Sequence, residues 1–133
     1  MRKYLSAFFL ALIMITMMCS ITAYAVDAKY SYTTSATSTL TITSGTAYCK
    51  STAKGNSTVT EIDAVQYLEK KSGSNWVAVS GGTWSGSANT RVLNMSNSKS
   101  NLSGGTYRLR TVFTVYNGSN SETVEKISSE VMA

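Results

Sequence analysis

The stretch TYRLRTVFTVY, residues 106–116, alternates apolar and polar side chains over most of its length. One of its faces carries the apolar and aromatic side chains Tyr107, Leu109, Phe113 and Val115. The opposite face carries Arg108, Arg110, Thr114 and Tyr116. Successive side chains of a strand point to opposite faces of its sheet, so this period of two predicts a strand with one face in a core and the other in solvent.

Six other segments predict strands by the same alternation and by their flanking turn residues: 39–44, 46–55, 58–71, 76–84, 90–96 and 121–128. In the second and third of these, the side chains expected to face the core are Ala47, Cys49, Ser51, Ala53, Ile62, Ala64, Gln66 and Leu68. SGSN (72–75) and NGSN (117–120) are typical of tight hairpin turns.

The chain contains no proline, and no segment beyond its N-terminus has the three-and-four apolar spacing of a helix. About seven short strands in roughly 100 residues, with a turn about every 8–12 residues, are typical of a sandwich. We therefore expect an all-β fold, a two-sheet antiparallel sandwich.

The first 25 residues have the three parts of a secretory signal peptide. Arg2 and Lys3 precede an apolar run over residues 4–21, and AYA at 23–25 places small residues at the cleavage positions. Cleavage after Ala25 would remove this helical segment and release residues 26–133 as one secreted domain. An uncleaved membrane anchor is the alternative, because the run approaches the length of a membrane span.

The charge of the chain gives little support to a nucleic-acid partner. Without Arg2 and Lys3 the net charge falls from +5 to +3. The densest basic positions left are Lys70 with Lys71 and Arg108 with Arg110. A nucleic-acid interface requires a clustered basic face with interleaved aromatic side chains, so we expect no nucleic-acid binding.

Two segments resemble paired strands of immunoglobulin domains. AYCKSTA (47–53) resembles strand B, with Cys49 at the inward position, and SGGTYRL (103–109) resembles strand F. The resemblance places Tyr107 at the corner before strand F and Leu109 where a second cysteine would form the inter-sheet disulfide. Cys49 is the only cysteine after the signal peptide, so no intramolecular disulfide is expected and Cys49 should meet Leu109 as an apolar pair.

Over nearly all of residues 26–133, the chain resembles a family of short secreted proteins of Gram-positive bacteria that carry one immunoglobulin-like domain. The family has no assigned activity, so the resemblance implies a fold and an extracellular location and no catalytic residue. The motifs that carry it are the Cys-x-x-x-Ala-x-Gly pattern over 49–55, AVQYLEKKSGSNW (64–76), GGTYRLRT (104–111) and VYNGSNSET (115–123).

The sequence offers little catalytic chemistry. It has no histidine, which removes the usual general base and the commonest metal ligand. Glu61 and Asp63 are spaced like a carboxylate pair on one strand face, within reach of the geometry of an inverting glycosidase. We interpret them as solvent-facing charges, and we expect a protein that is not an enzyme and uses no cofactor or metal.

Binding is the remaining route to function. Candidate binding residues are Tyr67, Arg108 and Arg110 on outward strand faces, and Trp84, which suits either a sugar or the edge of a sandwich. Glu69 is expected to lie near Arg108 or Arg110, because the strands that carry them are expected to be antiparallel neighbours. Such pairing is the alternative to a recognition surface.

The sequence therefore predicts a secreted binding module whose partner is an extracellular protein or polysaccharide. A secreted antagonist, such as a small basic bacteriocin-like protein or an enzyme inhibitor, is the alternative. A monomer is expected, although an unpaired Cys49 leaves a disulfide-linked dimer open. Four Asn-x-Ser/Thr triplets, which chance and turn chemistry explain better than glycosylation, begin at Asn56, Asn94, Asn101 and Asn117.

Overall fold

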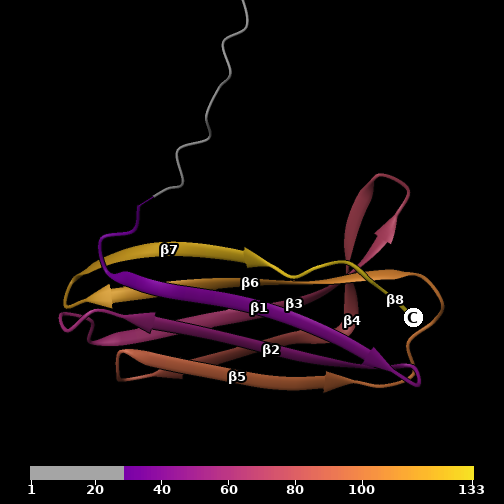
Figure 1. Ribbon diagram of the computed structural model, residues 1–133, viewed down its shortest axis with the longest axis horizontal. Coiled ribbons are helices and arrows are strands. Elements are labelled where there is room, and N and C mark those ends of the chain that lie inside the picture. Colours follow the sequence, from indigo (N-terminus) through magenta and orange to yellow (C-terminus); the bar gives the residue numbers. More distant parts are fainter. Residues whose placement is uncertain (1–28) are drawn as a thin grey trace, which may run out of the picture.

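A computed structural model describes residues 29–133, so the expected signal peptide and its cleavage position after Ala25 lie outside the described residues. This part of the chain is all β, and none of it forms a helix long and apolar enough to cross a membrane. The strands, shown in Figure 1, are β1 (Thr33–Thr43), β2 (Thr46–Gly55), β3 (Glu61–Ser72), β4 (Asn75–Ala88), β5 (Val92–Lys99), β6 (Thr106–Asn117), β7 (Asn120–Ile127) and β8 (Val131–Met132).

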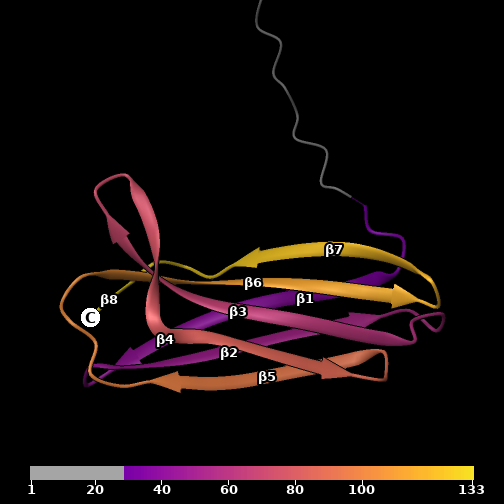
Figure 2. The ribbon, with the colours of Figure 1, turned by 180° about the vertical axis from the view of Figure 1, so that it is seen from behind.

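The strands form two antiparallel sheets. The first has the order β1-β2-β5, and the second has the order β4-β3-β6-β7, with β8 also paired to β6. Figures 1 and 2 show the two sheets as layers whose strands run mostly along the long axis of the molecule. The all-β class and the two antiparallel sheets are thus confirmed.

The largest differences from the sequence-based prediction concern three strands. The first strand begins at Thr33 rather than residue 39, because the Ser/Thr-rich segment before 39 also pairs with β2 from Thr33 onward, with a register shift between Thr33 and Ser35. The fourth strand continues to Ala88 beyond an interruption. An eighth strand, β8, was not predicted, because two residues are too few to show a period.

The core lies between the sheets and contains the predicted inward residues of β2, β3 and β6. It consists of two apolar clusters. The larger cluster includes Phe113, Ile62 and Val115, and the smaller one includes Tyr107 and Leu68. Both clusters use alternate residues of the same strands, which is why the period of two predicted their members correctly.

A layer of polar side chains separates the two clusters. Gln66 and Thr111 are fully buried, with 0% of their surface exposed. The Nε2 of Gln66 donates to Ser51 Oγ at 2.7 Å, and Asn97 Nδ2 donates to Gln66 Oε1 at 2.8 Å. Thr111 Oγ1 lies 2.7 Å from Ser51 Oγ and 3.0 Å from Ser38 Oγ. We call these five residues the polar layer.

The hydroxyl protons of the polar layer have a single consistent arrangement. Ser38 Oγ donates to the carbonyl oxygen of Leu109 at 3.1 Å. Because a hydroxyl has only one proton, Thr111 must donate to Ser38, and Ser51 must donate to Thr111. Every buried side-chain nitrogen and oxygen in residues 29–133 has a hydrogen-bond partner. The layer is therefore fully satisfied, as a buried polar network must be to avoid a large desolvation cost.

Tyr107 fixes the entry to β6. Its ring is buried in the smaller cluster, while its hydroxyl donates to the carbonyl oxygen of Ser103, four residues earlier, at 2.6 Å. Cys49 and Leu109 belong to that same cluster. The aromatic ring thereby anchors the β5–β6 connection to the core at the end of the molecule where the C-terminus lies (Figure 1).

The N-terminal end of β1 is held by one carboxylate on β7. Glu122 accepts hydrogen bonds from the backbone amides of Ser31, Tyr32 and Thr33 at 2.6–2.8 Å, and from the Thr33 hydroxyl at 2.8 Å. Partial burial alone would raise the pKa of the Glu122 carboxyl, but these four bonds lower it below its ordinary value. Because β1 and β7 belong to different sheets, Glu122 links the two layers.

Candidate functional site

The β3–β4 hairpin bends away from the body of the sandwich. Tyr67 pairs with Thr83 but Glu69 pairs with Ala78, so residues 79–82 of β4 leave the ladder. Gly81 has a φ of +72° in this bulge, a conformation that favours glycine. Bulges bend the strand that carries them, and Figures 1 and 2 show the hairpin standing out beside the end of the sheets.

The outer face of the second sheet carries a row of stacked aromatic and charged side chains. Glu69 accepts from Arg108 Nε at 2.9 Å and from Arg110 Nε at 3.1 Å, so its predicted proximity to these arginines is confirmed. The Arg108 guanidinium lies 4.3 Å from the centre of the Trp76 ring, and the Arg110 guanidinium lies 4.3 Å from that of Tyr67. We call these five residues the outer-face row.

The charged and aromatic groups of the outer-face row mainly contact one another. Glu69 is only 6% exposed, although the sequence predicted an outward-facing residue, because the side chains stacked around it cover it. Desolvation alone would lower the pKa of the Arg110 guanidinium, but Glu69 and Glu125 raise it above its ordinary value. The structure thus brings Tyr67, Arg108 and Arg110 together, in an arrangement that favours structural pairing over an open recognition surface.

Trp84, the fourth candidate binding residue, lies apart from the other three. It pairs with Gln66 across the β3–β4 ladder and packs against both apolar clusters. This placement agrees with the interpretation of Trp84 as a packing residue at the edge of the sandwich.

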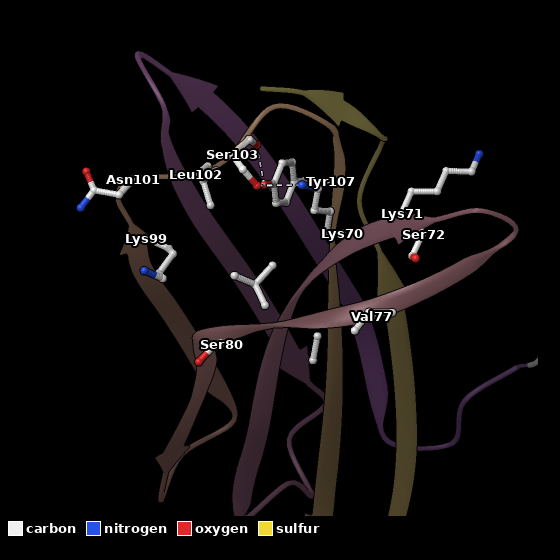
Figure 3. Close-up of a pocket in the computed structure, with 12 residues that line it drawn as sticks. Lys70, Lys71, Ser72, Val77, Ser80, Lys99, Asn101, Leu102, Ser103 and Tyr107 are labelled. Carbon is white, nitrogen blue, oxygen red and sulfur yellow. Dashed lines mark hydrogen bonds between the residues drawn. The ribbon is translucent and has the colours of Figure 1, made fainter.

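A cavity of about 540 Å³ lies between the bent hairpin and the β5–β6 connection. We call it the hairpin hollow; its lining comes from residues 70–72, 77–80, 99, 101–103 and 107. Figure 3 shows the hairpin crossing one side of it, with Lys99 and Asn101 on the other side. Its volume lies in the range of about 300–1,000 Å³ that is typical of ligand sites.

The hairpin hollow combines apolar and cationic surfaces. Leu102, Val79 and Tyr107, which also pack in or against the smaller core cluster, form part of its lining. Lys70 donates from Nζ to Ser103 Oγ at 2.7 Å, and its Nζ lies 5.7 Å from the centre of the Tyr107 ring. All of the charged side chains among the lining residues are lysines.

No family model, curated protein or solved structure matches this chain. The site is therefore interpreted from its own geometry.

The carboxylate pair considered from the sequence lies on the outer face of the second sheet, away from the hairpin hollow. Glu61 accepts a bond of 3.4 Å from the Ser87 hydroxyl, and Asp63 lies beside Ser85 and Ser87. Desolvation raises the pKa of the nearby Tyr116 phenol, and Asp63 and Glu61 raise it further. Within residues 29–133, no three His, Cys, Asp or Glu side chains are grouped as metal ligands would be.

The hairpin hollow is only partly predictable from the sequence. Lys70 and Lys71 form a basic pair in the sequence. Lys99 and Leu102 carried no signal, because their role depends on the contact between the β5–β6 connection and a hairpin about 25 residues earlier. A glycine pair in the middle of a strand pattern, at Gly81 and Gly82, was the available indication of a bulge.

Cys49 is expected to react very slowly with thiol reagents in the native protein. Burial raises the pKa of its thiol from 9.0 to about 11, which lowers its thiolate fraction at pH 8 by roughly 100-fold relative to an unperturbed cysteine. Mass spectrometry of the labelled peptide should therefore show modification of Cys49 only after unfolding in urea. Rapid native labelling, or a Cys49-linked dimer, would contradict this prediction.

Proposed function

We propose that the protein is a secreted, non-catalytic immunoglobulin-like module that binds an extracellular ligand in the hairpin hollow. The observation that carries the proposal is the hollow itself. A bulge lifts the hairpin from the sheet, and the resulting cavity is lined by apolar, hydroxyl and cationic groups. Concave sites of this size, with a few polar groups on an apolar surface, are the usual form of small-ligand sites.

The immunoglobulin-like assignment is supported by the order of the strands. β1, β2 and β5 take the places of strands A, B and E, and β3, β6 and β7 take those of C, F and G. The bond from the Tyr107 hydroxyl to the Ser103 carbonyl has the form of a tyrosine corner, two residues before the position of the second cysteine.

The non-catalytic assignment rests on the chemistry of the side chains. The chain has no histidine, and the raised pKa of Cys49 opposes formation of the thiolate nucleophile. The extracellular assignment rests on the charged start, apolar run and AYA of the first 25 residues.

Filling the hairpin hollow is expected to abolish binding. Ser80 is exposed in its lining, so Ser80→Trp should occupy the space that a ligand needs. The protein produced from the full sequence would be passed over immobilised cell-wall polysaccharide and surface-protein extracts, and retained material would be quantified. We expect at least about a tenfold loss of retention, equivalent to about 1.4 kcal/mol.

The matched control is Ser96→Trp, an equal change at an exposed position of β5 outside the hollow. It should retain the binding of the parent protein. Equal retention by the parent and Ser80→Trp would contradict the proposed site.

A further inference from the structure

The charges of the hairpin hollow are unbalanced. Lys70 and Lys99 are both half-buried, and neither has a carboxylate within 4.0 Å among the residues that the structure describes. Lys70 bonds to a neutral hydroxyl, and Lys99 Nζ donates to the carbonyl oxygen of Ser100 at 3.3 Å. The two ammonium groups therefore leave a positive potential in the hollow.

The neighbouring outer-face row differs, because its arginines are paired with carboxylates. On the neighbouring outer-face row, Glu69 bonds to both Arg108 and Arg110, and Glu125 also lies within 3.5 Å of Arg110. Lys71, the third lysine of the lining, points away from the hollow in Figure 3, and its Nζ lies 5.8 Å from the centre of the Trp76 ring. The hollow thus has two ammonium groups available for a ligand, one on each side.

Other polar side chains also belong to the lining of the hollow. Asn101 and the hydroxyls of Ser72 and Ser80 line the hollow and make no side-chain hydrogen bond within the described chain. Asn101 has a φ of +57°, an uncommon conformation that the β5–β6 connection requires at this position. Amide and hydroxyl donors beside ammonium groups are the groups that bind anionic oxygens.

We propose that the hairpin hollow binds an anionic oxygen group, phosphate or carboxylate, between Lys70 and Lys99, while the body of the ligand lies on the apolar lining. This inference rests on the proposed function, because it names the ligand class of the same site. A compact ammonium group acts as a point charge and does not impose the planar bidentate geometry of arginine. It can therefore donate hydrogen bonds to either phosphate or carboxylate oxygens. The anion belongs either to a small molecule or to a repeating unit of a polymer.

The test is titration calorimetry of the full chain with polygalacturonate, which carries carboxylates, with polyphosphate, and with neutral dextran. Galacturonate and inorganic phosphate, added as competitors, distinguish a small anion from a polymer-borne one. We expect binding to at least one anionic probe and none to dextran. Lys70→Gln/Lys99→Gln should weaken that binding about tenfold or more, and raised salt should weaken it in the parent protein.

The matched control is Lys50→Gln/Lys54→Gln, which removes the same charge from exposed positions of β2. It should change the affinity by less than about twofold, within the range of general screening. Equal weakening by both pairs, or no anionic binding at all, would overturn the inference. If Ser80→Trp abolished retention of an extract component that the Lys70→Gln/Lys99→Gln protein still bound, the hollow would be a site for a neutral ligand. That result would overturn the anion inference and leave the proposed function intact.

Discussion

Replacing Gln66 by leucine is expected to lower the free energy of unfolding by about 3 kcal/mol, although the two side chains are similar in size. Gln66 is fully buried between the two apolar clusters, where its amide bonds to Ser51 and Asn97. The leucine cannot donate to Ser51 or accept from Asn97, so both partners lose a hydrogen bond where water has little access. Urea denaturation at neutral pH, with an unchanged slope, would measure the effect.

A double-mutant cycle can separate the contribution of the lost Gln66–Ser51 hydrogen bond from that of altered packing. Ser51→Ala removes the hydroxyl that accepts from Gln66. The double variant should lose less stability than the two single variants together, by about 1 kcal/mol, because the shared hydrogen bond is lost only once. Ser96→Ala on the exposed face of β5 is the control and should change stability by less than about 0.5 kcal/mol. A Gln66→Leu protein as stable as the parent would contradict the prediction.

Replacing Glu122 by glutamine is expected to cost about 2 kcal/mol of stability at neutral pH and to release the start of β1. The carboxylate accepts four hydrogen bonds from residues 31–33. A glutamine side chain has one accepting oxygen and would direct its NH₂ group at some of the same donors. Hydrogen exchange at the amides of Tyr32 and Thr33 should accelerate, while exchange in β3 and β6 should change much less.

The Glu122 contribution should also depend on pH. The folded protein lowers the pKa of this carboxyl below its ordinary value of about 4.5. Its stabilising effect is therefore fully present above that ordinary value and is lost as the pH falls through the lower pKa of the folded state. The stability difference between the parent and Glu122→Gln should shrink in acid. Glu130→Gln, at an exposed position, is the control, and a difference that stayed constant down to acidic pH would refute this account.

The sequence by itself determined the all-β class and the inward faces of the central strands. The alternation of residues such as Cys49, Ile62 and Leu109 placed each of them in the core, because side chains of a strand point alternately to its two faces. It also placed Glu69 beside Arg108 and Arg110. Both inferences needed only the local period and the antiparallel pairing of two strands.

Only the tertiary structure decided which polar residues hold the core together. Thr111 interrupts the apolar face of β6 in the sequence. Its role as a hydrogen-bonding partner follows only from the folded structure, in which Ser38 and Ser51 of the other sheet lie opposite it. In the same way, nothing in the sequence distinguishes Glu122 from other acidic residues, because its partners lie at the start of β1 and are brought to β7 only by the fold. Such partners are 60–90 residues apart along the chain, a separation at which local periodicity carries no information.

The hairpin hollow was likewise decided by the tertiary structure. The bulge over residues 79–82 lifts the hairpin, and the β5–β6 connection closes the opposite side with Lys99 and Leu102. A period of two specifies which face of a strand is buried, but not how far a strand bends or which distant loop it meets. Those features depend on the bulge within the β3–β4 ladder and on the meeting of the hairpin with a separate segment of the chain.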